Sequence, residues 1–219
     1  MLCLIEINDY LDRLGQLLVQ EHLKYCNRSV KLETLIRFVN GFAFKSNSYV
    51  ENGQYKVITI KNVQDGSVDS TGANFVDELP LRLSNECCLK IGDVLLSLTG
   101  NVGRVGAVCE NFLLLNQRVA KIVPHNKKLL PFMYFYFRGD DCKNRLIQLS
   151  RGTAQANLSP VETLNEEIPY NDEMTVELSD KLSPLFDQII HNNQEVNLLS
   201  SIRDTLIPKL LSGEIDLAK

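Results

Sequence analysis

The chain has 219 residues, of which 44% are hydrophobic and 23% are charged, and its formal net charge is −4. This composition is that of a globular protein with a buried core, and it excludes a disordered chain. No run of eighteen apolar residues occurs, which excludes a transmembrane helix, and we expect no secretory signal peptide because the first residues lack a basic region. The six cysteines form no CxxC pair, so we expect reduced thiols in a cytoplasmic protein and neither disulfides nor a metal site.

The charge is distributed unevenly along the chain. Residues 1–30 carry a net charge of −1, residues 31–170 one of +2 and residues 171–219 one of −5. Between Arg118 and Arg151, eight basic residues stand against two acidic ones. Such a cluster can neutralise DNA phosphates, but it can equally be a solvated basic face, and charge alone leaves both interpretations open.

The amino-terminal segment is predicted to form a helix. Its apolar residues recur at alternating steps of three and four, which lines one helical face: Leu4, Ile7, Leu11, Leu14 and Leu18. The sequence NRS at 27–29 breaks this pattern, so the helix is expected to end before it.

Residues 30–170 follow a different pattern, which predicts a mixed, mostly β domain. Short β-rich runs alternate with turn signals: YKVITI (55–60), CLKIGDVLLSL (88–98), VGAVCE (105–110) and RVAKIVP (118–124). Two stretches within this region are predicted to be helical. They are KLETLIRFV (31–39), ended by Asn40-Gly41 as a glycine cap, and the aromatic-rich LLPFMYFYFRGDDCKNRLIQLS (129–150).

The last segment is predicted to be a long helix. From Leu178 onward, steps of four and three place apolar residues at eight of ten positions over about four and a half heptads, which is the spacing of a coiled-coil seam. Ser183-Pro184 is expected to mark a kink or a fresh start, and Ser212-Gly213 to end the helix. The seam needs a partner, either the amino-terminal helix or another chain.

The stretch GDVLLSLTGNVGRVGAV (92–108) contains four glycines and raises the question of a phosphate-binding loop. It matches neither the Walker pattern GxxxxGK[ST] nor a GxGxxG that opens a helix, because it continues into a strand-like run. Without a helix N-terminus there are no free amides and no helix dipole to hold an anion. We therefore expect a β-hairpin whose glycines permit positive φ or a close approach of two backbones.

Patterns of catalytic residues are absent from the sequence. The three histidines, His22, His125 and His191, are scattered, and neither HExxH nor GxSxG occurs. The acidic pair at 166–167 is interpreted as a solvated strand edge and not as an acid/base dyad. The chain is therefore expected not to be an enzyme and to need no cofactor.

The polar stretch SRGTAQANLS (150–159) follows the basic cluster directly. Its arginine, threonine, glutamine and asparagine offer donors and acceptors that suit base edges and phosphates. An ordinary surface loop is the alternative interpretation of the same residues.

Six stretches stand in an informative order: VNGFAFKSNSY (39–49), YKVITIKNVQDG (55–66), IGDVLLSLTGNVGRVG (91–106), LLNQRVAKIVP (114–124), RGTAQANLSPVETLNEEIP (151–169) and SIRDTLIPKLLSGEI (201–215). In this order they resemble the specificity subunits of type I restriction–modification systems. The resemblance covers about residues 30–215, and the opening INDYLDRLGQLL resembles the end of a spacer helix before a target-recognition domain.

This resemblance implies a non-catalytic DNA-binding subunit. A full-length specificity subunit carries two target-recognition domains, each reading one half of a bipartite duplex sequence. Two long antiparallel helices separate the domains and bind the methyltransferase subunits, and the modification and restriction subunits hold the chemistry. Because this chain departs from that pattern in having one such domain and one long helix, we expect a half-subunit, a fragment or a rearranged copy.

The expected fold is therefore α+β. A short spacer-like helix is assigned to residues 1–28, and a mixed, mostly β target-recognition domain with short helices to residues 30–170. A long coiled-coil helix is assigned to residues 172–215, which we expect to pair antiparallel in a two-fold homodimer. The residues expected in that interface are Leu182, Leu185, Ile189, Asn192, Val196, Leu199, Leu206 and Leu210, with Asn192 and Arg203 setting the register.

The residues expected to contact double-stranded DNA fall into two groups. Those expected at phosphates are Lys45, Lys61, Arg104, Arg118, Lys143, Arg145 and Arg151. Those expected at base edges are Asn62, Thr99, Asn101, Gln117, Thr153, Gln155 and Asn157. Two alternatives stay open, namely a truncated interaction module that binds methyltransferase subunits without productive DNA reading, and a standalone nuclease or methyltransferase with an unrecognised site.

Overall fold

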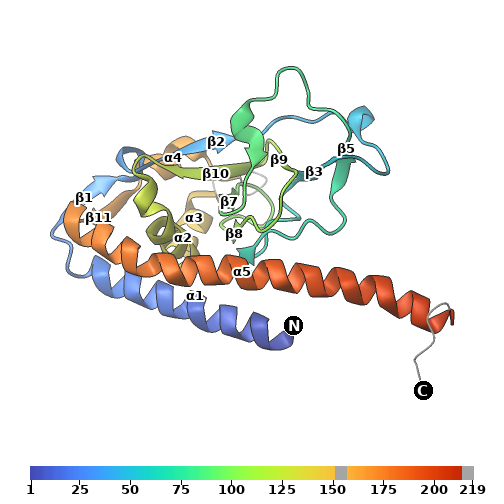
Figure 1. Cartoon of the computed structure of the whole chain (residues 1–219). Coiled ribbons are helices and arrows are strands. Elements are labelled where there is room, and N and C mark those ends of the chain that lie inside the picture. The colour runs from blue at the N-terminus through green and yellow to red at the C-terminus, as the bar shows by residue number, and fades with distance from the viewer. Residues whose placement is uncertain (151–156, 214–219) are drawn as a thin grey trace.

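The computed structural model describes residues 1–150 and 157–213 (Figure 1). Two long helices, α1 (Leu2–Leu23) and α5 (Asp172–Leu211), lie side by side, and a mostly β domain rests on them. The predicted α+β fold is confirmed. Among the described residues, no helix is both long and apolar enough to cross a membrane.

Helix α1 runs antiparallel to α5 along much of the length of α5. At one end, His22 Nε2 of α1 lies 2.9 Å from Thr175 Oγ1 of α5, and at the other end Met1 contacts Ser200. Val19 of α1 is buried in the common core. The amino-terminal helix is thus confirmed, and its partner is α5 of the same chain.

The described residues of the middle domain form three β-sheets. The five-stranded sheet has the order β2 (Ile36–Asn40), β10 (Val119–Pro124), β7 (Val94–Ser97), β8 (Val105–Ala107) and β4 (Gly66–Ser67). The four-stranded sheet has the order β5 (Asn74–Val76), β3 (Tyr55–Ile58), β9 (Leu113–Leu115) and β6 (Cys88–Leu89). A small ribbon pairs β1 (Arg28–Lys31) with β11 (Glu167–Tyr170). Strand pairs are antiparallel except β4–β8 and β3–β9, which are parallel.

Short helices connect and cover these sheets: η1 (Leu32–Thr34), η2 (Ser46–Ser48), η3 (Asn85–Cys87), η4 (Lys127–Leu129), α2 (Leu130–Arg138), α3 (Asp140–Ser150) and α4 (Pro160–Asn165). Helix α2 is buried from Pro131 to Phe137 because it contacts the five-stranded sheet as well as α1 and α5. A Cβ on Gly15 of α1 would lie 2.3 Å from the Phe135 ring, so glycine permits this close packing. The helical prediction for 129–150 is confirmed as α2 and α3.

The stretch KLETLIRFV (31–39) is not the helix that we expected. Lys31 ends strand β1, and the following residues form the turn η1 and then β2, which pairs antiparallel with β10. An isolated helix of nine residues is marginal, whereas the β-branched Ile36 and Val39 suit a strand and become buried in it. Gly41 therefore follows a strand and is not a helix cap. Glycine is needed there for a close approach of two backbones, since a Cβ would lie 2.2 Å from the Asn116 carbonyl oxygen.

Helix α5 runs without interruption through Ser183-Pro184, contrary to the expected kink or fresh start. It begins after Asn171, whose side chain caps the first turn. Pro184 is exposed, so water can satisfy the carbonyl that its missing N–H leaves unbonded, while Leu182 beside it is fully buried and holds the helix in place. The expected end is confirmed, because Gly213 follows the helix with a φ of 72°.

Candidate nucleic-acid interface

Strands β7 and β8 form the β-hairpin predicted for residues 92–108. The chain turns at residues 98–104, where Gly100 and Gly103 adopt φ values of 71° and 81°. Gly106 serves another purpose, because a Cβ there would lie 2.2 Å from the Ser67 carbonyl oxygen of the adjacent strand β4. The hairpin is confirmed, and it presents residues 98–104 at the end of the five-stranded sheet.

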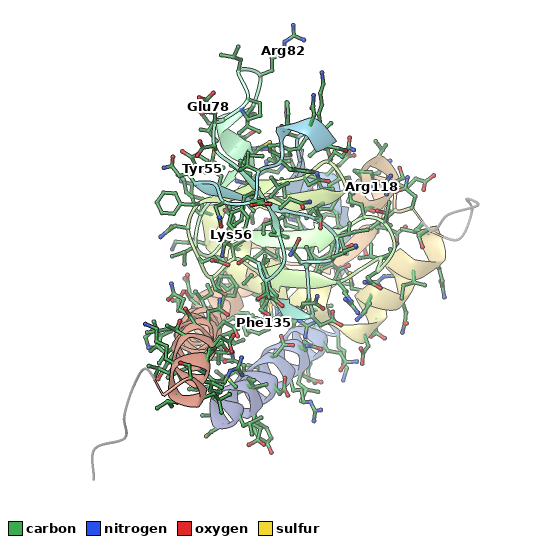
Figure 2. All side chains as sticks on the ribbon, turned by 90° about the vertical axis from the view of Figure 1, so that its right-hand side faces the viewer. Tyr55, Lys56, Glu78, Arg82, Arg118 and Phe135 are labelled. Atoms are coloured by element: carbon green, nitrogen blue, oxygen red, sulfur yellow. The ribbon has the colours of Figure 1, made fainter. Side chains whose placement is uncertain are left out.

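Four connecting segments meet at this end of the two larger sheets, and together we call them the loop edge: residues 41–47, 59–64, 98–104 and 116–118. The amide of Gln117 donates to the Phe42 carbonyl at 3.0 Å and the amide of Leu98 to the Arg118 carbonyl at 3.2 Å. The amide of Asn116 donates at 3.1 Å to the carbonyl of Ile58, the last residue of β3 before the 59–64 segment. Segments that are far apart in the sequence therefore form one surface. Figure 2 shows its Arg118 at a distance from the two long helices.

The loop edge is basic although the chain as a whole is acidic. Its four segments contain no Asp or Glu, and they contain four basic residues: Lys45, Lys61, Arg104 and Arg118. Lys45, Lys61 and Arg118 are exposed, whereas Arg104 is half-buried and donates from Nη1 to Gln64 Oε1 at 2.9 Å. Cations in segments that contain no acidic residue contribute a positive potential that attracts phosphates, and the neighbouring Asp65 is paired with Arg138 and Lys143.

Polar side chains of the predicted base-contacting group lie among these cations. Asn101 and Gln117 are exposed on the loop edge. Asn157, also exposed, forms an isolated β-bridge with Thr99, and this bridge brings the 157 end of the polar stretch to the hairpin. Thr99 is half-buried, and its Oγ1 is buried without a hydrogen-bond partner in the described part of the chain.

The structure contradicts the base contact that was predicted for Asn62. The residue is only 4% exposed. Its side-chain oxygen accepts hydrogen bonds from the backbone amide and the hydroxyl of Thr59, at 3.0 and 2.9 Å, and its amide nitrogen donates to the Asp69 carbonyl at 2.9 Å. All its hydrogen-bonding groups shape the loop from inside, so it is not available to a base.

The two basic residues predicted on α3 are both engaged within the chain. Lys143 donates to Asp65 Oδ2 at 2.9 Å and packs near Gly103 at the hairpin tip, so it lies beside the loop edge. Arg145 instead donates to the Tyr136 hydroxyl at 2.9 Å, and its guanidinium carbon lies 6.0 Å from the centroid of that ring, beside α1. Burial raises the pKa of Tyr136, so this hydroxyl stays neutral. Arg145 therefore has a packing role and does not join the loop edge.

Three predicted contacts, Arg151, Thr153 and Gln155, lie outside the described residues. The structure therefore gives no position for them. They stay predictions.

Helix α1 covers the first part of the predicted dimer seam and leaves the second part exposed. Leu182, Ile189 and Asn192 are at most 2% exposed and Leu185 is partly buried, all within the chain's own core. The amide of Asn192 donates to Asn8 Oδ1 of α1 at 2.8 Å. These four residues are thus an intramolecular interface, which corrects their assignment to a dimer.

Within the described residues, the second part of α5 has no such cover. Residues 201–211 lie beyond the contact of α1 with Ser200, and the apolar side chains of 198–211 are exposed by 36% or more: Leu198, Leu199, Ile202, Leu206, Ile207, Leu210 and Leu211. Val196 is half-buried at the border between the two parts. The candidates Leu199, Leu206 and Leu210 are therefore available to a partner.

The structure also contains a buried ion pair that sequence reasoning missed. Arg138 at the end of α2 contacts Asp12 of α1 and Asp65 of the segment after β3. The only local signal is an arginine that closes an aromatic run, and its partners are 126 and 73 residues away. Within the described residues, no group of three or more His, Cys, Asp or Glu side chains is placed to hold a metal ion.

Comparisons with known proteins place this geometry in a family. Residues 27–200 match the family described as "Type I restriction modification DNA specificity domain". The HindI specificity subunit of Haemophilus influenzae is 28% identical over 148 residues, which is 66% of this chain and 30% of that protein. The EcoBI specificity subunit of Escherichia coli is 23% identical over 168 residues, or 73% of this chain and 35% of that protein.

Solved structures agree with the fold. The S subunit of a type I system from M. genitalium gives a TM-score of 0.58 at 21% identity and covers 95% of this chain and 55% of its own. The HsdS subunit of Thermoanaerobacter tengcongensis gives 0.51 at 15% identity, with 96% and 54% covered. The chain thus spans about a third of its curated relatives and about half of these solved chains. It belongs to the type I restriction–modification DNA specificity domain family.

Proposed function

We propose that this chain recognises one half of a bipartite duplex DNA sequence, and that catalysis on that DNA belongs to other subunits. The observation that carries the proposal is the loop edge, where four cations gather without an acidic residue in a chain of net charge −4. The family description as a DNA specificity domain supports it. The described residues contain one mostly β domain with one loop edge, and one such surface suits a single half-site.

Two kinds of side chain on the loop edge suit two kinds of DNA contact. Lys45, Lys61 and Arg118 are exposed cations that suit phosphate contacts, which release counterions and make affinity fall with salt. Asn101 and Gln117 carry carboxamides, whose paired donor and acceptor suit the adenine edge in the major groove. Phosphate contacts hold the domain on the duplex, and the carboxamides supply sequence preference.

Selection from a randomised duplex library tests this proposal. The recovered duplex is then bound at several salt concentrations by the wild type and by Lys45→Gln/Lys61→Gln. This double variant should bind every duplex more weakly and flatten the dependence of log K on log salt by about 0.9 per lost phosphate contact. The charge-matched control is Lys127→Gln/Lys128→Gln, at the opposite end of β10, and it should keep the wild-type slope. Equal effects of the two pairs would contradict a role specific to the loop edge.

We further propose that residues 198–211 of α5 bind a second copy of this chain, with the two α5 helices antiparallel. A run of seven exposed apolar residues at helical spacing is unusual on a monomer and supports a helical partner. Such a dimer carries two loop edges at opposite ends and leaves its outer helical faces to methyltransferase subunits. Sedimentation should show a dimer at micromolar concentration and the selection should recover a palindrome, whereas a monomer at that concentration contradicts the pairing.

The exposed leucines also favour a second candidate, an interaction module without DNA reading. In that case the chain binds methyltransferase subunits, and the library shows no enriched duplex with or without them. An enriched duplex in either condition excludes this candidate.

A further inference from the structure

Asp65 lies between the loop edge and the helices. It directly follows the 59–64 segment, and its carboxylate accepts hydrogen bonds from two cations: Oδ1 from Arg138 Nη1 at 3.0 Å and Oδ2 from Lys143 Nζ at 2.9 Å. The Asp65 side chain is 41% exposed, whereas that of Arg138 is only 13% exposed. A largely buried guanidinium therefore holds an exposed loop carboxylate.

Arg138 is itself fixed by helix α1. Its Nε donates to Asp12 Oδ2 at 3.1 Å, and its Nη2 donates to the same oxygen. Gln16, one turn further along α1, donates to that oxygen at 2.9 Å. The planar guanidinium thus bridges α1 and Asp65 with different nitrogens, which fixes its orientation.

On its other side, Asp65 adjoins a residue that holds the hairpin tip. Gln64 Oε1 accepts a hydrogen bond from Arg104 Nη1 at 2.9 Å, and Gln64 Nε2 donates to the Lys61 carbonyl at 2.8 Å. The backbone N–H of Gln64 donates to the Ser67 carbonyl at 3.0 Å. The direction of the Arg104 guanidinium therefore depends on the position of Gln64, one peptide unit from Asp65.

We propose that Asp65 is a positioning residue for DNA reading, which holds Gln64 so that Arg104 presents one fixed orientation at the loop edge. The contacts form a continuous path from α1 through Arg138 and Asp65 to Gln64 and Arg104. A cation held in one orientation distinguishes base edges, whereas a mobile one contributes only general attraction to phosphates. The inference rests on the proposed DNA reading.

The sign of the effect of Asp65→Asn on affinity tests this role. Removal of a negative charge strengthens binding to any duplex if Asp65 acts only through its charge. The positioning role predicts the opposite for the selected duplex, with affinity about tenfold weaker than for the wild type while affinity for random duplex is unchanged or higher. Asp69→Asn is the charge-matched control, because the Asp69 side chain accepts a hydrogen bond from the nearby Thr71 backbone amide at 2.8 Å and makes no ion pair within the described residues. A parallel rise for both variants on both duplexes would overturn the proposal.

A double-mutant cycle separates action through Arg104 from a general loosening of the fold. In the Arg104→Gln background, Asp65→Asn should cause little further loss of affinity for the selected duplex, because the guanidinium that Asp65 positions is already absent. Additive losses would overturn the proposal.

A measurement on the free protein tests the positioning role of Asp65 independently of DNA binding. Hydrogen exchange of the free protein should be faster in Asp65→Asn at the amides of Gln64 and Arg104, which bond to Ser67 and Asn101, and unchanged in Asp69→Asn. Unchanged exchange in Asp65→Asn overturns the positioning role even where DNA binding is intact. A wild-type protein that selects no duplex overturns the proposed function, whatever the exchange rates.

Discussion

The two parts of helix α5 have similar heptad spacing but different surroundings. In residues 175–192 the seam residues Leu182, Ile189 and Asn192 are at most 2% exposed, because α1 and α2 cover them. In residues 198–211 the corresponding Leu199, Leu206 and neighbouring apolar side chains are exposed by 36% or more. Periodicity therefore predicts that a helix has an apolar face, but it does not say which element covers that face.

The difference in cover between the two parts of α5 has an energetic consequence. Burial of a leucine side chain contributes to folding only where the folded chain removes it from water. The covered part of α5 should accordingly contribute to the stability of the monomer, and the uncovered part to association with a partner. Four substitutions test this difference, ordered here by their expected effect on the free energy of unfolding.

Leu182→Ala should have the largest effect, because Leu182 is fully buried against the core. Loss of its side chain leaves a cavity and should lower the free energy of unfolding by about 2 to 5 kcal/mol. Chemical denaturation measures this change. Leu206→Ala, on the same helix but 41% exposed, is the matched control and should change the free energy of unfolding of the monomer, measured at a concentration below that of dimer formation, by less than about 0.5 kcal/mol. Similar losses for the two variants would show that the two parts of α5 do not differ.

Asn192→Ala should have an intermediate effect. Asn192 accepts a hydrogen bond from Gln188 at 2.7 Å and donates one to Asn8 Oδ1 at 2.8 Å, in a largely buried contact between α5 and α1. The substitution leaves the Asn8 oxygen without this donor, and it should cost about 1 to 3 kcal/mol in a denaturation experiment. Asn197→Ala, at an exposed position of α5, should be close to neutral.

His22 should make the α1–α5 contact sensitive to pH, with a smaller effect. Burial lowers the pKa of His22 below its ordinary value of 6.5, and the ring contacts Thr175. Below pH 6.5 the unfolded chain takes up a proton that the folded chain still excludes, so stability falls as the pH drops through this range and is fully present above it. Thermal unfolding at pH 7.5 and 5.5 measures the fall, which His22→Gln should reduce. The control His191→Gln, at an exposed position of α5, should keep the wild-type pH dependence.

The combined substitution Leu199→Ser/Leu206→Ser/Leu210→Ser should have the smallest effect on the monomer. These side chains are already exposed, so unfolding of the monomer should change little. Sedimentation should nevertheless show loss of the dimer that we propose. A dimer that persists in this variant would place the interface elsewhere.

Local sequence patterns predicted many of the helices and strands, and they failed where long-range pairing decides the conformation. The leucine spacing of α1 and α5 and the glycine spacing of the β7–β8 hairpin act over fewer than about ten residues at a time, and the structure confirms both elements. The KLETLIRFV prediction was wrong because pairing with β10, more than eighty residues away, decided its conformation. No local pattern contains that pairing.

The candidate site follows the same division. Lys45, Lys61, Arg118, Asn101 and Gln117 were predicted from residue type, and the structure shows that their side chains are exposed; their contact with DNA stays a prediction. Asn62 and Arg145 have equally suitable side chains, but tertiary contacts bury Asn62 and hydrogen-bond Arg145 to the Tyr136 hydroxyl. Residue type predicts what a side chain can bind, while burial decides whether a ligand reaches it.

The sequence by itself determined the two amphipathic helices, the glycine turns and the type I specificity family, because each of these is encoded in the spacing or order of neighbouring residues. Only the tertiary structure decided that α1 covers the first part of the α5 seam, that four separate segments form one basic edge, and that Arg138 links that edge to α1 through Asp65. These features depend on contacts between residues about 20 to 185 positions apart, and such contacts form only when the whole chain packs.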